Sequence, residues 1–274
     1  MLQRYIDHFG AWAVVGTILL TVTFLIAPII VSILMSFDAR SYLGRFPPTE
    51  FSFHWYARFF SDTYYLNGLK TSLIIAVIAA SVSTCAGVCA AIVIDRYEFP
   101  GKQALETIFL SPLVIPAVVI GFSLLLFFAL IGVFQGYPRL LAGHIIITFP
   151  YAVRTTLAGL TGIRKNLTEA AMTLGANERQ AFWDVTFPLA RTGMVAGAVF
   201  AFAFSMDDVA VSLFLTSPQT YTLPVAMVSM MRTNFDLTIA AASVILMLFT
   251  IGLIIILDVI VGLERVIGGG VYRS

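Results

Sequence analysis

Two adjacent carboxylates lie inside a long apolar stretch of this chain. Asp207 and Asp208 fall in FSMDDVAVSLF, within a segment that has no basic residue between Arg191 and Arg232. An acid at the centre of a bilayer costs roughly 2.5–3.5 kcal/mol on insertion scales, so such acids usually face a cavity or a partner. Neighbouring helix positions point about 100° apart, so one carboxylate can line a pathway and attract a cation while backbone donors hold the other. Alternatively, Asp208 caps a broken helix.

A second group of polar residues separates two apolar runs, in the stretch EAAMTLGANERQAFWDVTFP at residues 169–188. Its pattern predicts two short helices joined by a glycine turn, a segment that we call the elbow. Thr168 is placed to cap the first helix, and Gly175 has the backbone freedom that the position after a helix end requires. Asn177 is placed to cap the second helix, which Pro188 is expected to end.

The composition of the elbow is typical of a surface that binds another protein. Its first arm carries Glu169 followed by Ala170 and Ala171, whose small side chains allow another backbone to approach closely. Its second arm carries Phe182 and Trp183, and large aromatic side chains often anchor protein–protein interfaces. The alternative is an amphipathic hairpin that lies on the lipid surface.

These features belong to a chain with the composition of a membrane protein. Of its 274 residues, 59% are hydrophobic and 11% are charged, and the mean hydropathy is +0.94, whereas soluble domains carry about 25% charged residues. The net charge of +1 gives no general attraction to nucleic acid. Runs long enough to cross about 30 Å of hydrocarbon predict an all-α polytopic membrane protein. Its six transmembrane helices are expected at about 11–36, 67–94, 105–131, 139–161, 191–215 and 238–262.

The distribution of lysine and arginine orients these spans. More of these residues flank the ends that face the cytoplasm when the N-terminus is inside, which predicts both termini in the cytoplasm. The elbow then lies in the largest cytoplasmic loop, residues 162–190. We expect a single membrane domain over residues 1–274, with its core at about 67–262.

Catalytic and metal chemistry find little support in the sequence. His144, in the fourth predicted span, has no second His, Cys or carboxylate at ligand spacing, so no metal site is predicted. No catalytic constellation is evident, and the chain is not expected to be an enzyme. The phosphate-binding pattern G-x-x-x-x-G-K-[ST] is also missing, so ATP and its Mg²⁺ must be bound by another chain. A channel or a secondary transporter would account for the two acids but would leave the elbow without a purpose.

The elbow also carries a family resemblance. The order Glu-Ala-Ala, three residues, Gly, nine residues, an aliphatic residue, one residue, an apolar residue and Pro resembles the EAA loop of binding-protein-dependent ABC importer permeases. The matching positions are Glu169, Ala170, Ala171, Gly175, Val185, Phe187 and Pro188. Val185 and Phe187 stand where that family usually has Ile and Leu. Three further stretches, at 51–73, 111–128 and 204–224, are similar to permeases of the spermidine/putrescine type.

The resemblance implies a division of labour between subunits. Such a permease pairs with a second homologous permease in the inner membrane of a bacterium, above a dimer of ATPase subunits and beneath a soluble substrate-binding protein. The elbow then serves as a coupling helix. In that role Glu169 makes a charged contact with the ATPase, Gly175 sets the turn, and Phe182 and Trp183 fill the socket.

The implied activity is ATP-driven import of a small solute by alternating access. A polyamine such as spermidine or putrescine is the first candidate, because the two acids favour a cation and because the resemblance is to polyamine permeases. Amino-acid-like compounds, aminophosphonates, thiamine and ferric iron stay open as cargo, since related permeases carry them.

Overall fold

The computed structural model describes residues 2–40, 44, 46–161 and 165–261. Residues 162–164 of the predicted cytoplasmic loop and residue 262 of the sixth predicted span lie outside the described residues. The chain divides into two compact units. The first comprises Met1–Asp62 with Met230–Leu248, and the second comprises Thr63–Ser229 with Phe249–Ser274.

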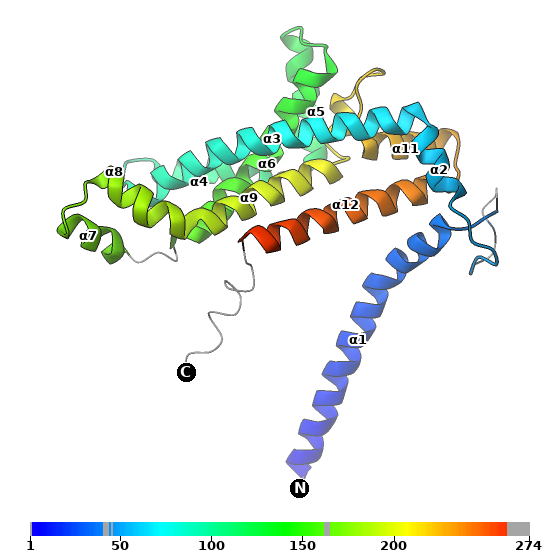
Figure 1. Ribbon diagram of the computed structural model, residues 1–274, viewed down its shortest axis with the longest axis horizontal. Helices are drawn as coiled ribbons and strands as arrows, with labels where there is room; N and C mark the ends of the chain where they lie inside the picture. The colour runs from blue at the N-terminus through cyan, green and yellow to red at the C-terminus, as the bar shows by residue number, and fades with distance from the viewer. Residues whose placement is uncertain (1, 41–43, 45, 162–164, 262–274) are drawn as a thin grey trace. The chain divides into compact units, whose positions relative to one another are not determined.

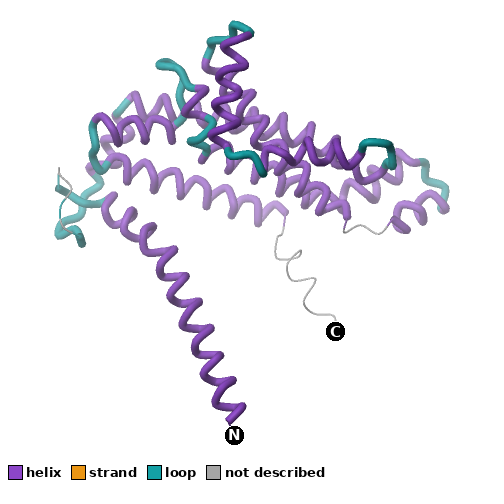
Figure 2. The backbone as a smooth tube through the Cα atoms, turned by 180° about the vertical axis from the view of Figure 1, so that it is seen from behind, coloured by secondary structure: helices purple, strands orange, loops and turns teal. Residues whose placement is uncertain are grey.

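The regular structure of the described residues is helical, as predicted, with two isolated β-bridges and no strand (Figure 2). The elements in chain order are α1 (Leu2–Ser36), α2 (His54–Ser61), α3 (Thr63–Arg96), α4 (Lys102–Leu110), η1 (Ser111–Leu113), α5 (Ala117–Leu130), α6 (Gly136–Thr161), α7 (Lys165–Thr173), α8 (Glu178–Ala181), η2 (Phe182–Thr186), α9 (Phe187–Asp207), α10 (Ser212–Leu215), α11 (Leu223–Thr233) and α12 (Thr238–Val261) (Figure 1).

The first unit is built around the aromatic segment at residues 51–61, which follows α1 and includes α2. Helix α2 buries Trp55 and Phe59. The Trp55 indole donates a hydrogen bond of 2.7 Å to the Asp38 carbonyl oxygen. Trp55 also packs with Met35, Leu237 and Ala241 in a small core. These contacts join the end of α1, the aromatic segment and the start of α12 within one unit.

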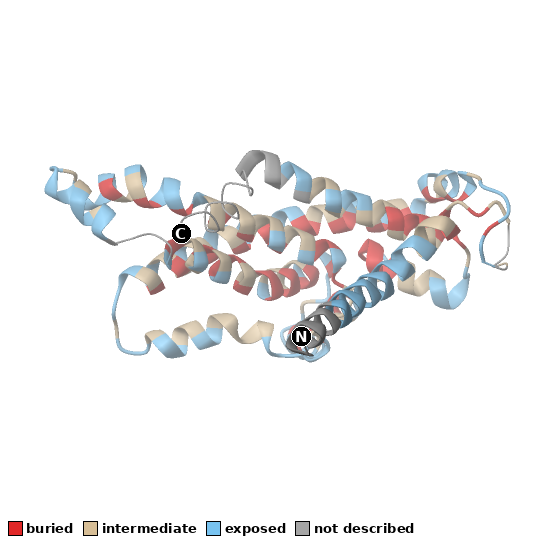
Figure 3. Cartoon of the chain, turned by 90° about the horizontal axis from the view of Figure 1, so that it is seen from below, coloured by how far each residue is buried: buried red, intermediate tan, exposed pale blue. Residues whose placement is uncertain are grey.

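The second unit is a bundle in which α3, α6 and α9 run side by side, with α7 and α8 at one end (Figure 1). Small residues allow the close approach of these helices. A Cβ atom at Gly193 of α9 would lie only 2.6 Å from the Thr155 carbonyl oxygen of α6, and one at Gly87 of α3 would lie 2.7 Å from the Cβ of Ala152. Buried positions gather along these helices (Figure 3). The bundle therefore has a fixed backbone spacing.

Four helices among the described residues are long and apolar enough to cross a membrane: Trp12–Ser36, Thr63–Arg96, Gly136–Thr161 and Glu178–Asp207. The bent pair Lys102–Leu113 and Ala117–Leu130 makes a fifth crossing if it is counted as one span. The described apolar part of α12, Thr238–Leu253, is shorter. The described residues thus contain four or five helical segments of crossing length, as expected of a polytopic helical protein, and the predicted total of six spans stays a prediction.

The third predicted span, 105–131, is not one continuous helix. Its two parts meet at a bend of 100°. Pro116 stands immediately before α5 with φ −55° and ψ 130°, and proline disfavours helical geometry in the residue that precedes it. The polypeptide therefore leaves one helix at residues 114–116 and starts another.

The fifth predicted span, 191–215, differs at both ends. The helix begins at Glu178 and runs through Pro188 without a break as far as Asp207. Asp208 has an extended conformation, with ψ 124°, and residues 212–215 form the separate helix α10. At about 1.5 Å of rise per residue, this 30-residue helix is about 45 Å long. It joins the elbow to the acidic pair.

Candidate functional site

The turn of the elbow has the geometry that its sequence predicts. Gly175 has φ +96°, a left-handed conformation that glycine adopts without steric cost. The N–H of Gly175 donates to the Met172 carbonyl, and the N–H of Ala176 donates to the Ala171 carbonyl. These two bonds form a Schellman motif, which closes the end of α7. The predicted position of Gly175 directly after the first arm is confirmed.

The two caps predicted for the elbow have different outcomes. Asn177 forms a full capping box at the start of α8: its side chain accepts from the N–H of Gln180, and the Gln180 side chain accepts from the N–H of Asn177, both at 2.9 Å. Thr168 was predicted to cap the first arm, and this is wrong because α7 already begins at Lys165. The Thr168 hydroxyl lies instead 3.5 Å from the Thr186 hydroxyl of the second arm.

Pro188 was predicted to end the second arm, and this is also wrong. Residues Phe182–Thr186 form a π-helical turn, in which the N–H of Phe187 donates to the Phe182 carbonyl five residues earlier. The wider turn accommodates the residue that lacks an N–H, because proline in an ordinary helix clashes with the carbonyl four residues before it. The second arm of the elbow is therefore the first part of the long helix that ends at Asp207.

One side chain of α3 holds the second arm in place. Arg96 donates a hydrogen bond of 3.0 Å to the hydroxyl of the buried Thr186. Its guanidinium group also lies 4.7 Å from the centre of the Phe182 ring, within the range of a cation–π interaction. Behind the first arm is a cleft of about 210 Å³ that Arg96, Thr186 and Glu169 help to line. Phe182 is therefore half-buried by its own chain.

Much of the surface of the elbow is not covered by the rest of the described chain. Glu169 and Ala170 are exposed, and the Glu169 carboxylate has no hydrogen bond or ion pair with the residues that the structure describes. Trp183 is 52% exposed and Leu174, at the turn, is 89% exposed. Leu174 was not singled out in the sequence, where one leucine in an apolar chain carries no signal. The elbow thus presents an acid and two large apolar side chains.

At the other end of the long helix, the acidic pair separates into two environments. Asp207 is the last residue of α9 and is exposed, whereas Asp208 is buried. The Asp208 carboxylate accepts hydrogen bonds from the N–H of Val211 at 3.3 Å, the N–H of Ser212 at 2.8 Å and the Ser212 hydroxyl at 2.9 Å. These are the donors that the start of α10 would otherwise leave unpaired. The alternative that Asp208 caps a broken helix is confirmed.

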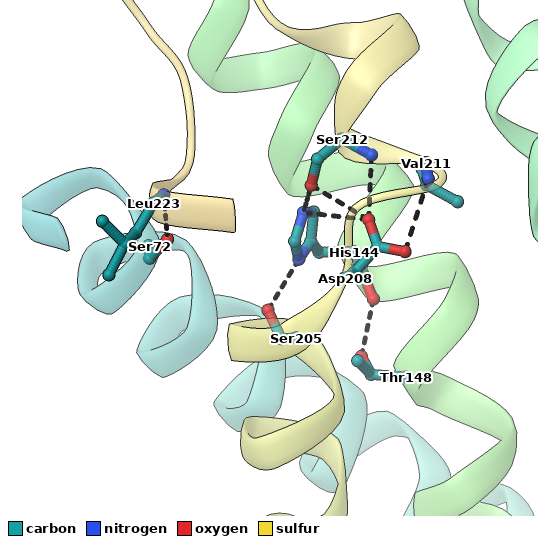
Figure 4. A network of polar contacts seen from close by, with 8 residues as sticks. All are labelled: Ser72, His144, Thr148, Ser205, Asp208, Val211, Ser212 and Leu223. Atoms are coloured by element: carbon teal, nitrogen blue, oxygen red, sulfur yellow. Dashed lines mark hydrogen bonds and ion pairs between the residues drawn. The ribbon is translucent and has the colours of Figure 1, made fainter. Parts of the chain in front are cut away.

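A histidine from α6 completes this arrangement (Figure 4). The fully buried His144 has its Nδ1 atom 2.7 Å from the Ser205 hydroxyl and its Nε2 atom 2.9 Å from the Ser212 hydroxyl. Its Nε2 atom is 4.0 Å from the Asp208 carboxylate. No sequence pattern connects His144 with this site, because its two serine partners lie 61 and 68 positions away. The one signal that could have marked His144 is its polarity within an apolar span.

Comparisons with known proteins place the chain in a family. The model of the family described as "Binding-protein-dependent transport system inner membrane component" matches residues 83–263. The chain belongs to this family. It is therefore a permease of the ABC importer type, a transport subunit in a multi-pass protein class of the inner membrane.

Individual relatives of this permease agree with the family. It is 31% identical, over 86% of its length and 91% of the relative's, to the spermidine/putrescine transport system permease protein PotC of Haemophilus influenzae. It is 27% identical, over 84% and 92% of the two lengths, to the molybdate/tungstate transport system permease protein WtpB of Pyrococcus abyssi. Its fold is similar to a chain in the crystal structure of a bacterial alginate ABC transporter in complex with an alginate pentasaccharide-bound periplasmic protein. That match has a TM-score of 0.73 at 18% identity and covers 95% of each chain.

Proposed function

We propose that the chain is one of two permease subunits of an ATP-driven importer that moves a small cation into the cytoplasm by alternating access. A polyamine such as spermidine or putrescine is the cargo that we favour. The observation that carries this proposal is the exposed Asp207 carboxylate at the end of α9. The similarity to a polyamine permease supports the same cargo class.

The surroundings of Asp207 favour a cation over an anion. Asp207 makes no hydrogen bond or ion pair with the residues that the structure describes. It lies at the C-terminal end of a long helix, where the helix dipole is negative and favours positive charge. A carboxylate and a helix C-terminus together attract an ammonium group and repel an oxyanion. This argues for a polyamine over the oxyanion cargo named for the molybdate/tungstate relative.

The long helix supplies a route from ATP hydrolysis to the cargo. In our proposal the elbow seats in an ATPase subunit, with Glu169 at a charged contact and Trp183 in a socket. Closure of the ATPase dimer displaces the elbow, and the helix Glu178–Asp207 carries that displacement to Asp207 as a rigid body. Hydrolysis takes place on the ATPase subunits, which bind ATP and Mg²⁺. Phe182 contributes less to the socket than the sequence suggests, because Arg96 already covers its ring.

The family supports the remaining parts of the proposed assembly in general terms. A second homologous permease completes the pathway, a soluble binding protein delivers the cargo from outside, and both termini of this chain lie in the cytoplasm. Amino-acid-like, aminophosphonate, thiamine or ferric cargo remain the alternatives within the same importer class. A secondary transporter or channel would have no use for an exposed elbow at the end of the helix that carries Asp207.

The decisive experiment removes the Asp207 charge in the complete transporter. Asp207→Asn should lower the apparent affinity for spermidine or putrescine by roughly 5- to 150-fold, the range expected for one carboxylate in a partly dry pathway. Asp207→Glu is the matched control and should retain most of the uptake. ATPase activity stimulated by the binding protein should persist in both variants. Equal uptake by the wild type and Asp207→Asn would remove Asp207 from the cargo pathway and leave the polyamine assignment to similarity alone.

A further inference from the structure

The break between α9 and α10 is bridged by a single imidazole ring. Ser205 lies in the last turn of α9, and Ser212 is the first residue of α10. His144 contacts both hydroxyl groups, through Nδ1 on one side and Nε2 on the other. Residues 208–211 therefore form a short connection whose two ends are tied to the same residue of α6.

The hydrogen bonds around this ring define one proton arrangement. The Ser212 hydroxyl donates its only proton to the Asp208 carboxylate, so it must accept from His144 Nε2–H. In a neutral imidazole Nδ1 is then the acceptor, and the Ser205 hydroxyl donates to it. The result is a directed chain from Ser205 through His144 and Ser212 to Asp208, in which each group has a partner (Figure 4).

At the end of α9, only one side chain is neither buried nor part of this hydrogen-bonded network. Of residues 205–208, Ser205, Met206 and Asp208 are 2%, 1% and 7% exposed, and only the Asp207 side chain is exposed to the surface. Because the residues on both sides of Asp207 are buried and two of them are hydrogen-bonded, the backbone at this position cannot rotate freely. The direction of the Asp207 carboxylate is set by its neighbours and not by contacts of its own.

We propose that His144 is a positioning residue for the cargo carboxylate: by tying Ser205 to Ser212 it holds the α9–α10 break in the form that points Asp207 out of the packed bundle. The cargo part of this inference rests on the proposed function. The orientation part does not, because it concerns only the direction of one side chain. His144 itself is fully buried and does not contact cargo.

The orientation is tested by chemical labelling in the assembled transporter. The two exposed cysteines, Cys85 and Cys89, are replaced by serine, and Asp207→Cys is introduced as the probe for a cationic methanethiosulfonate reagent. Adding His144→Asn, which keeps an amide near the Nδ1 position and leaves Ser212 without its donor, should change the labelling rate roughly 3- to 30-fold. Adding His144→Gln, which can reach the Nε2 position, should change it less.

A buried hydroxyl elsewhere on α6 provides the matched control. Thr148, one turn beyond His144, is buried, donates a hydrogen bond of 2.7 Å to the His144 backbone carbonyl and lies 2.7 Å from the Ser83 hydroxyl of α3. Thr148→Val removes these buried contacts but leaves the His144 ring and its two serine partners in place, so it should leave the labelling rate unchanged. If His144→Asn prevents assembly, Ser212→Ala removes only the hydroxyl between the ring and Asp208 and should shift the rate in the same direction. An unchanged rate in both the His144→Asn and the Ser212→Ala proteins would overturn the proposal.

Uptake measurements connect the orientation to cargo. His144→Asn should raise the KM for spermidine while binding-protein-stimulated ATPase activity is retained, and it should add nothing further in an Asp207→Asn background. A purely structural histidine predicts a loss of assembled complex and a fall of both activities, and additive effects with Asp207→Asn would also overturn the proposal. If labelling shifts but Asp207→Asn leaves uptake unchanged, the positioning stands and the proposed cargo contact fails.

Discussion

The elbow and the α9–α10 break lie at the two ends of one long helix, and they are built in opposite ways. At the break, His144, Ser205, Asp208 and Ser212 satisfy one another inside the bundle. At the elbow, Leu174 is 89% exposed and Trp183 is 52% exposed, and the Glu169 carboxylate has no partner among the described residues. The break holds its geometry without help from another chain. The elbow exposes apolar and charged side chains that the described part of its own chain does not contact.

This difference matches the tasks proposed for the two regions. The break has to hold the Asp207 carboxylate in one direction, and this requires rigid surroundings. A buried polar network in which every group is paired provides such rigidity. A surface that must seat in another protein needs exposed anchors. The helix Glu178–Asp207 connects the two regions without interruption, and in our proposal it carries a displacement of the elbow to the break.

The largest effect is expected from reversing the charge at the elbow. Glu169→Lys should abolish ATP-driven uptake, because it places a positive charge where we propose that the ATPase supplies one. Glu98→Lys is the matched control: it makes the same reversal at an exposed position outside the elbow, in the connection between α3 and α4, and should retain uptake. Uptake in proteoliposomes and co-purification of the ATPase subunits are measured for both. Normal uptake and normal co-purification in Glu169→Lys would show that the elbow is not the coupling element.

A smaller effect, on stability, should separate the two acids at the break. Asp208→Asn turns an amide donor toward buried backbone N–H groups and should destabilise the folded complex by about 1–3 kcal/mol. Asp207→Asn changes an exposed side chain and should stay within about 0.5 kcal/mol. Thermal unfolding of the purified complex in detergent compares them. Equal destabilisation of both variants would show that the hydrogen bonds of Asp208 add no more to the free energy of unfolding than the exposed Asp207 does.

The turn of the elbow should be sensitive to a single methyl group. Gly175→Ala introduces a side chain at φ +96°, at a cost of about 1–2 kcal/mol, although the added Cβ meets no atom within 4 Å. Gly101→Ala carries the same kind of strain at φ +87°, also in open space, in the connection between α3 and α4. Uptake should fall in Gly175→Ala only. A comparable fall in Gly101→Ala would assign the effect to general strain and not to the elbow.

The smallest effect should come from the contact between Arg96 and the second arm. Arg96→Gln can keep a hydrogen bond to Thr186 but loses the cation–π contact with Phe182, which is worth about 0.5–1 kcal/mol at an exposed site. Amide hydrogen exchange should rise by a few-fold at most in residues 182–187. Lys102→Gln loses an ion pair of 2.8 Å with Glu98 and serves as the control, with exchange in the second arm unchanged. No difference between these variants would show that Arg96 does not hold the arm.

The sequence by itself determined those features that depend on composition and on neighbours a few residues apart. Charge-poor runs predicted a helical membrane protein, and the motif that includes Glu169, Gly175 and Pro188 indicated the permease family by resemblance. The conformation of Gly175 and the capping box of Asn177 were predictable because both are local: their hydrogen bonds span three to five residues.

Only the tertiary structure decided the features that depend on distant partners. Pro188 continues a helix because a π-turn precedes it, and Arg96 of α3 contacts two residues of that turn. Asp207 and Asp208 are the same residue type at adjacent positions, but Asp208 is buried and bonded to the N–H groups of Val211 and Ser212, whereas Asp207 is exposed. His144 became interpretable once Ser205 and Ser212, more than sixty positions away, were seen on either side of its ring. Burial and hydrogen bonding between separate helices decide these cases, and no short-range pattern records them.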